Sequence, residues 1–212
     1  MSSCTVRSVV PPKSPDHPDV KRAVLDAAIA IIAADGPDAL SMREVARRAD
    51  ISHQAPYHHF ADRAGILAAI SEEGYRAFAV EFRQTLASST DPLADCLRTY
   101  VRFAMRHRGH FKVMFRSDIC GVETHEHTRA AADDAFLALL DFAARVSPRT
   151  GTGPDALTLP TILWSQAHGL ATLLIDGPLA RKLPPEVSVD ALVDSVAAMI
   201  SRMMDMSAAR PR

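Results

Sequence analysis

The stretch LSMREVARRADISHQAPYHHF, residues 40–60, decides the expected fold. Ser41 and Glu44 have the S-x-x-E spacing of a capping box, in which each side chain binds the other residue's free backbone N–H. Leu40 and Val45 occupy the two ends of a hydrophobic staple, which sets the direction in which the chain enters a helix. This segment therefore predicts a helix that begins after Ser41 and runs for about two turns.

The second half of the stretch predicts a tight turn and another helix. Asp50 tolerates the left-handed backbone conformation better than most residues, and Ser52 offers a new N-cap. Pro56 lacks a backbone N–H, but in a helix capped by Ser52 it would forfeit only the first intrahelical hydrogen bond. A helix that begins later, or opens with a 3₁₀ turn, avoids even that loss. We therefore expect a second helix that starts late or distorted.

Helical periodicity continues on both sides of this stretch, while strand patterns are almost absent. We expect an all-α protein of about nine helices, with helices near 20–35, 42–49, 53–59, 63–86, 92–108, 110–116, 126–146, 156–175 and 189–206 and a loop at 117–124. The expected organisation is a mobile, proline-rich tail at 1–18, a three-helix helix-turn-helix domain at 19–79 with its helix-turn-helix at about 41–60, a larger helical domain for effector binding and dimerisation at 80–206, and a short tail at 207–212.

Composition narrows the functional classes. The 212-residue chain has a formal net charge of −1, so any nucleic-acid site must be local. Cys4, Cys96 and Cys120 are widely spaced, which argues against a disulfide framework and against a thiolate metal site. The longest apolar run, 27–34, is too short to span a bilayer, and the N-terminus lacks the apolar core of a signal peptide. These features predict a cytoplasmic protein without a membrane partner.

Three helices within about 45 residues, the last two joined by a tight turn, are typical of a helix-turn-helix. In that geometry the second helix of the pair lies in the DNA major groove and its first residues reach base edges. Gln54 can bridge two groups on adenine, His53 can donate to or accept from a base edge, and Ala55 can touch a thymine methyl. Phosphate contacts are expected from the flanking side chains Arg43, Tyr57, His58 and Arg63.

A three-helix lobe with a solvated polar face fits the same pattern equally well. Residues 20–66 hold six basic and six acidic side chains, so net charge does not decide between the two interpretations. The placement of the side chains has to decide.

The run GPDALSMREVARRADISHQAPYHHFADRAGIL, residues 36–67, resembles the DNA-binding region of the tetracycline-repressor (TetR) family of bacterial regulators. The resemblance spans about residues 19–79. It implies an all-helical homodimer with a ligand-responsive C-terminal body. Two positions depart from the family pattern, since the family turn usually has glycine where this chain has Asp50, and its recognition helix usually has a branched apolar residue where this chain has Pro56.

Carried over residue by residue, the resemblance implies DNA contacts at both helices of the pair. Ser41 and Arg43 match positions that contact the DNA backbone or a base, and Arg63 matches a position usually held by lysine. The predicted set of DNA-contacting residues is Arg22, Ser41, Arg43, Ser52, His53, Gln54, Ala55, Tyr57, His58 and Arg63.

The C-terminal half contains the motif WSQAHG, residues 164–169, which resembles the Trp-His-Gly signature of one subclass of the family. Trp164 and His168 are four residues apart, so they share a helix face and can line an effector cavity with His168 as its polar anchor. Alternatively, Trp164 fills core and His168 binds a backbone carbonyl. The predicted cavity residues are Phe103, Met114, Trp164 and His168.

The last helix carries a broad apolar stripe of Leu192, Val193, Val196, Met199, Ile200 and Met203. Packed with the 156–175 helix and the same two helices of a second copy, it would form a four-helix bundle. The alternative is that the stripe packs only within its own chain. We expect a homodimer, because two helix-turn-helix units read two half-sites.

The sequence predicts no catalytic residue, no metal ion and no cofactor other than an unidentified small-molecule effector. His125 and His127 form an H-x-H pair near His107 and His110, but no cysteine or carboxylate set completes a site. Phosphate-cradling glycine loops, nucleophile elbows and H-E-x-x-H motifs are missing.

The leading hypothesis is a ligand-responsive repressor, not an enzyme, that binds a palindromic operator in double-stranded DNA. An activator or constitutive DNA binder of the same fold is one alternative. A helical enzyme that uses a histidine cluster is another.

Overall fold

The computed structural model describes residues 18–147, 154–175 and 177–208, and every regular element within these ranges is a helix. The elements are α1 (Pro18–Asp35), η1 (Pro37–Ala39), α2 (Met42–Arg48), η2 (Ala55–His58), α3 (Arg63–Ala87), α4 (Pro92–Arg106), α5 (Arg108–Met114), α6 (Ser117–Cys120), η3 (Val122–Thr124), α7 (Glu126–Val146), α8 (Pro154–Ile175), η4 (Ala180–Lys182) and α9 (Val189–Ala208). The tails predicted at 1–18 and 207–212 lie outside the described residues, apart from their innermost positions.

Side-chain caps begin the helices where the sequence predicts them. Ser41 accepts a hydrogen bond from the Glu44 N–H at 3.1 Å, and Asp62 accepts one from the Gly65 N–H at 2.8 Å. Asp91 caps α4 through the Ala94 N–H at 3.3 Å. Each cap satisfies a backbone donor that a helix leaves unpaired at its start.

The predicted capping box is only half formed, because the Glu44 side chain binds another residue. Its carboxylate binds the Arg47 guanidinium at 2.8 and 2.6 Å, and this ion pair holds the pKa of Glu44 below its ordinary value. Only the Ser41 half of the reciprocal cap is therefore formed.

Two expectations between α4 and α7 are wrong. The predicted loop at 117–124 contains α6 and η3, and Gly109, which lies between the predicted helices 92–108 and 110–116, is inside α5. A Cβ added at Gly109 would lie 2.5 Å from the carbonyl oxygen of Ile29 in α1. Glycine at this position therefore lets α5 pack against the α1 backbone, a contact that periodicity along the chain does not reveal.

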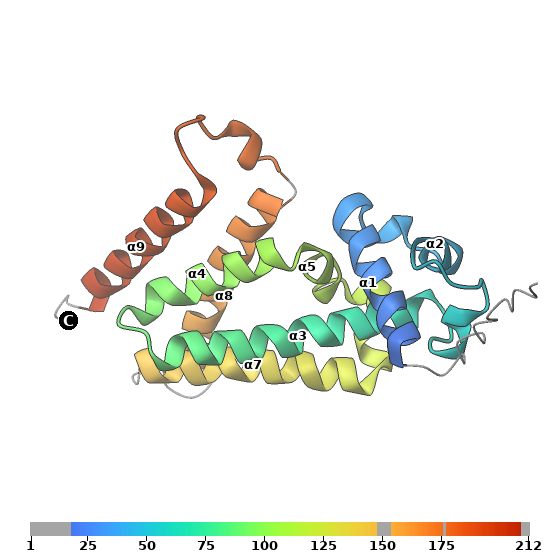
Figure 1. Cartoon of the computed structure of the whole chain (residues 1–212). Coiled ribbons are helices and arrows are strands. Elements are labelled where there is room, and N and C mark those ends of the chain that lie inside the picture. The colour runs from blue at the N-terminus through green and yellow to red at the C-terminus, as the bar shows by residue number, and fades with distance from the viewer. Residues whose placement is uncertain (1–17, 148–153, 176, 209–212) are drawn as a thin grey trace, which may run out of the picture.

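The helices enclose two apolar cores joined by α3. The first core, which we call the head core, consists of Val24, Leu25, Ala27, Ala28, Ile31, Ile32, Leu40, Val45, Phe60, Ile66, Leu67, Ile70, Val113 and Cys120. Helix α3 contributes Ile66 to the head core and Phe78 to the second, larger core. Figure 1 shows α3 running from beneath α1 along the whole length of α7. The boundary predicted at residue 79 thus falls within one continuous helix.

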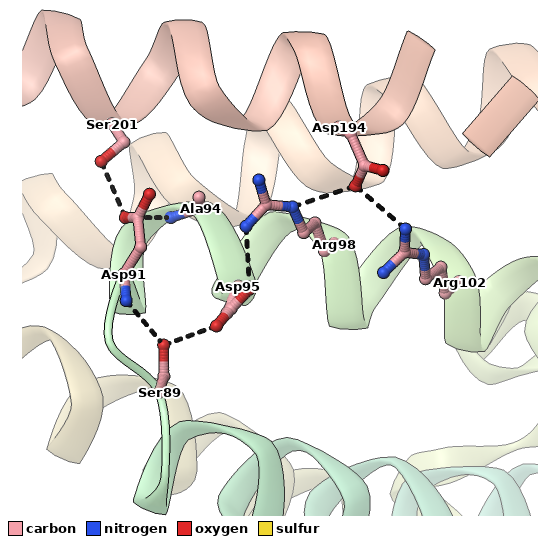
Figure 2. A network of polar contacts seen from close by, with 8 residues as sticks. All are labelled: Ser89, Asp91, Ala94, Asp95, Arg98, Arg102, Asp194 and Ser201. Atoms are coloured by element: carbon pink, nitrogen blue, oxygen red, sulfur yellow. Dashed lines mark hydrogen bonds and ion pairs between the residues drawn. The ribbon is translucent and has the colours of Figure 1, made fainter. Parts of the chain in front are cut away.

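Helices α8 and α9 both pack on α4, from different sides (Figure 1). Figure 2 shows the polar contacts that hold α9 in place. Arg98 and Arg102 of α4 both bind the Asp194 carboxylate of α9, at 3.0 and 2.9 Å. At the start of α4, Ser201 donates to the cap residue Asp91 at 2.8 Å. The position of α9 is therefore set by charge as well as by apolar packing.

Candidate DNA-contact surface and effector cavity

The turn after α2 is a left-handed helix ending. The Ile51 N–H binds the Ala46 carbonyl at 3.1 Å and the Asp50 N–H binds the Arg47 carbonyl at 3.4 Å, which is the Schellman pattern. Asp50 has φ 54°, and it is the one non-glycine residue with positive φ among those that the structure describes. The prediction of a left-handed Asp50 is confirmed.

The second helix of the pair, predicted near 53–59 and here called the recognition segment, is the short 3₁₀ helix η2. The Ala55 N–H binds the Ser52 carbonyl at 3.0 Å and the Tyr57 N–H binds the Gln54 carbonyl at 3.1 Å, so both bonds span three residues. The N-cap of η2 is Gln54, and the expected Ser52 cap is wrong because the helix begins two residues later than expected, at Ala55. Pro56 is the second residue of η2, where its missing N–H removes no helical bond. The predicted late, distorted start is confirmed.

The 3₁₀ winding decides which side chains of the recognition segment meet solvent. Ser52, His53 and Gln54 are exposed. Ala55 is only 9% exposed and lies with Pro56 on the buried side, so the expected contact between its methyl and a thymine is corrected. The candidate reading edge is therefore His53 and Gln54, followed by the exposed Tyr57 and His58.

The basic residues predicted to contact DNA have different surroundings. Arg43 is exposed and has no ion-pair partner in the described part of the chain. Arg22 is held by Asp26 at 2.6 Å and by Glu73 at 2.7 Å, and these contacts hold its pKa above the ordinary arginine value. Sequence reasoning missed Arg48, an exposed α2 residue whose nearest acidic oxygen, on Glu44, is 3.9 Å away.

Arg63 has a structural role in the free protein. Its guanidinium donates to the carbonyls of Leu40 at 3.0 Å and Pro37 at 2.8 Å, which ties the start of α3 to η1. Among the predicted basic contacts, Arg43 is thus the cation that no internal partner restrains.

The larger core contains a cavity of about 320 Å³, here called the aromatic cavity. It is lined by Tyr75, Phe78, Phe82, Cys96, Tyr100, Phe115, Ala132, Asp133, Ala135, Phe136, Leu139, Leu163, Trp164 and Ala167. These residues come from α3, α4, α7 and α8, together with Phe115 after α5. The wall is almost entirely apolar, with Asp133 as the single charged residue in it.

Tyr100 joins the two conspicuous residues of the WSQAHG motif. The Trp164 indole N–H donates to the Tyr100 oxygen at 3.3 Å, and that hydroxyl lies 2.8 Å from Nδ1 of His168. The Tyr100 hydroxyl accepts from the indole N–H, because an indole nitrogen only donates, and its contact with Nδ1 makes it the shared partner of Trp164 and His168. Burial lowers the pKa of His168 and raises the pKa of Tyr100, which favours the neutral form of each. The partner of His168 is thus a side chain rather than the backbone carbonyl considered above.

A second cavity of about 440 Å³ adjoins the first and shares Tyr75, Phe115 and Trp164 with it. Its wall also contains Met114, Ser117, Val122, Glu123, Ser165 and His168. Trp164 therefore lines both cavities, whereas Met114 and His168 line the second.

Phe103 lines neither of these two cavities, which corrects its prediction. It is buried and stacks on His107 with ring centroids 4.5 Å apart. Sequence reasoning missed Tyr100, although a lone hydroxyl within the apolar stripe of the 92–106 helix was the available signal.

Two family models match the chain. Residues 24–70 match the model of bacterial regulatory proteins of the tetR family, and residues 93–196 match that of the tetracyclin repressor-like C-terminal domain. The chain belongs to the TetR family of bacterial regulators. It is a DNA-binding transcriptional regulator, whose helix-turn-helix is α2 followed by η2. Its assignment to the Trp-His-Gly subclass stays a prediction.

Solved structures share this fold. A Rhodococcus sp. RHA1 protein of unknown function is 26% identical, covers 91% of this chain and 97% of its own, and has a TM-score of 0.67. A tetR-family regulatory protein from Rhodococcus RHA1 is 18% identical, with coverages of 88% and 97% and a TM-score of 0.64. The TetR-family regulator PfmR from Thermus thermophilus is 19% identical, with coverages of 84% and 97% and a TM-score of 0.63. No curated protein matches the sequence.

The apolar stripe of α9 in this TetR regulator is divided between core and surface. Val193 is fully buried in its own chain, so its assignment to a dimer interface is corrected. The side chains of Leu192, Val196 and Ile200 are partly buried against the same core. Met199 and Met203 point outward, as do Leu157, Ile162 and Leu173 on α8.

The described residues of this TetR regulator show no feature that supports a metal site or a membrane span. They contain no group of three His, Cys, Asp or Glu side chains placed to hold a metal ion. His125 lies with its Nδ1 2.9 Å from the Gly121 carbonyl oxygen, in the turn before α7. Among the helices in the described ranges, none has the length and apolarity needed to cross a bilayer.

Proposed function

We propose that this TetR regulator is a ligand-responsive repressor that binds a palindromic operator as a homodimer in the cytoplasm. The observation that carries the proposal is the exposed His53–Gln54 edge, presented directly after the left-handed turn at Asp50. Two such edges in a symmetric dimer would enter successive major grooves. The geometry gives no equivalent support to an enzyme.

Base reading and positioning are assigned to different residues. His53 and Gln54 read base edges, because both carry donors and acceptors and both are exposed. Arg43 and Tyr57 bind phosphates, since the first has no internal ion pair and the second is an exposed hydroxyl on the same surface. Further polar contacts with the DNA come from the edge of this surface, from Ser41, Ser52 and His58.

Helix α3 is the proposed connection between effector and operator. It supplies Ile66 and Ile70 to the head core, while Tyr75 and Phe78, two turns later, line the aromatic cavity. A ligand that displaces these rings therefore acts on the helix that supports the DNA-binding domain. Such a ligand changes the protein's affinity for the operator only if it binds the two states of the dimer with different affinities.

An operator-binding titration tests the proposal. Operator fragments are first selected from genomic DNA by the purified protein, and affinity is then measured by fluorescence anisotropy. His53→Ala and Gln54→Ala should each flatten the preference among operator variants, while Arg43→Ala and Tyr57→Ala should weaken binding to all sequences about fivefold or more. Arg76→Ala is the control, since Arg76 is an exposed arginine paired with Glu72 on α3. Wild-type affinity in both Arg43→Ala and Tyr57→Ala contradicts the docking geometry.

An activator or a constitutive DNA binder would use the same contact surface. Transcription measured with and without effector distinguishes the three, because a ligand-responsive repressor alone loses repression when effector is added.

A further inference from the structure

We propose that the aromatic cavity binds a compact amphiphilic cation, with an apolar or aromatic body inside the cavity and an ammonium-type group beside Asp133. The inference rests on the proposed function, because it names the chemical class of the effector. It goes beyond that function by predicting the sign of the ligand's charge.

The wall of the cavity accepts an apolar body and disfavours an anion. Seven aromatic rings line it, and no lysine, arginine or histidine does. A carboxylate or phosphate brought inside would lose its hydration and meet no cation or strong donor. Its volume of about 320 Å³ lies at the small end of the range for ligand pockets, which favours a compact ligand.

Asp133 supplies the complementary charge. It is exposed although it lines the cavity, which places it at the mouth. In the described chain no hydrogen bond or ion pair engages its carboxylate. The next residue, Asp134, is instead held by Arg83 at 2.9 and 2.7 Å. Arg83 of α3 thus pairs with one carboxylate of α7 and leaves the neighbouring carboxylate available at the entrance.

Two partly exposed rings, those of Phe136 and Trp164, line the same cavity as Asp133. Phe136 follows Asp133 by three residues on α7, so both lie on one face of the helix. Its ring centroid is 6.0 Å from that of Trp164, and these two lining residues are 39% and 38% exposed. Aromatic faces attract cations through their quadrupoles. A cation at the mouth would therefore gain from the carboxylate and from both rings.

The test uses Trp164, the single tryptophan of the chain, as its reporter. Its emission is titrated with 4-phenylbutylamine, 4-phenyl-1-butanol and 4-phenylbutyrate, which share a body and differ in head-group charge at neutral pH. The ammonium should bind about three- to tenfold more tightly than the alcohol, and the carboxylate most weakly. Added salt should narrow the difference, because it screens charges at an exposed mouth.

Two matched variants assign the effect to Asp133. Asp133→Asn should remove most of the preference for the ammonium over the alcohol, leaving only the part that the two rings supply, and should leave alcohol binding unchanged. Asp134→Asn removes the same charge one residue away and should keep the cation preference. The proposal is overturned if the carboxylate binds as tightly as the ammonium, if Asp133→Asn keeps the full wild-type preference, or if none of the three binds at millimolar concentration.

The regulator proposal is read out separately, by operator binding without ligand. Intact operator binding with no cation preference contradicts only the inference about the ligand. A cation preference without operator binding contradicts only the regulator.

Discussion

At the scale of single residues, Pro56 influences where the base-reading residues His53 and Gln54 are placed. Its ring sits on the buried side of η2, and its lack of an N–H is harmless at the second position of a 3₁₀ helix. Proline also disfavours α-helical angles at the residue before it. Ala55, that preceding residue, is nevertheless the first residue of η2, and His53 and Gln54 precede it in a turn, where their side chains are exposed.

Pro56→Ala tests this role. Alanine restores an N–H and frees φ, so the segment can wind into a regular α-turn and move His53 and Gln54. We expect a loss of about 1 kcal/mol in the free energy of unfolding and a changed preference among operator variants. Urea denaturation and competition binding measure the two effects, with Pro37→Ala in η1 as the control. An unchanged base preference would mean that Pro56 does not aim these residues.

His168 gives a second residue-scale prediction, on pH. Burial lowers its pKa from the ordinary value of 6.5, so below that value the unfolded chain binds more protons than the folded protein. The corresponding stability is complete above pH 6.5 and is lost as the pH falls through the lowered pKa. Burial lowers the pKa of His107 as well, so His107 contributes to the same loss of stability.

His168→Gln should therefore lose less stability than the wild type between pH 7.5 and pH 5.5. Thermal unfolding at the two pH values measures the difference. His127→Gln, which replaces an exposed histidine, should unfold like the wild type at both. A wild-type pH response in His168→Gln would show that the Tyr100–His168 pair does not titrate on unfolding.

At the scale of elements, α9 shows how an amphipathic helix is placed by charge. Apolar packing against α4 tolerates sliding, but two arginines of α4 converge on Asp194 of α9. The second contact, between Ser201 and the α4 cap Asp91, lies two turns further along α9. Together these contacts define one register of α9 on α4 (Figure 2).

Asp194→Asn should loosen α9 without unfolding the rest of the body. Asp194 is about half exposed, so we expect a cost of roughly 0.5–1 kcal/mol after solvent screening. Hydrogen exchange in α9 should become faster than in α3. Asp190→Asn is the matched control, because Asp190 is more exposed and contacts only Arg102, at 3.4 Å. Equal exchange rates in the two variants would refute the role of Asp194.

At the scale of the whole molecule, α8 and α9 provide the surface that we propose to face a second copy. Exposed apolar side chains lie on α8 and on α9, and both helices pack on α4. A four-helix bundle made by two copies would cover these side chains. The proposed interface therefore contains Met199 and Met203, and Val193 is left out because it is buried within its own chain.

Met199→Asp should shift the protein from dimer to monomer at micromolar concentration, because it places a charge in an apolar interface. Light scattering after size exclusion measures the mass. Leu137→Asp on α7 is the control, since Leu137 is 54% exposed and Met199 is 52% exposed. Dissociation by both variants, or by neither, would exclude the α8–α9 surface as the specific interface.

What the sequence determined by itself is local. The caps at Ser41, Asp62 and Asp91 and the left-handed Asp50 follow from interactions within a few residues. The helical periodicity and the TetR motif follow from the same short-range spacing, so the fold class and the family were predictable.

Tertiary structure alone decided what depends on contacts between distant segments. The positions of neighbouring helices decide that Ala55 and Val193 are buried. They also decide that Phe103 does not line the cavity and that Tyr100 pairs with His168. Periodicity shows that a helix has an apolar face, but it does not show which neighbour covers that face or which part of it remains exposed.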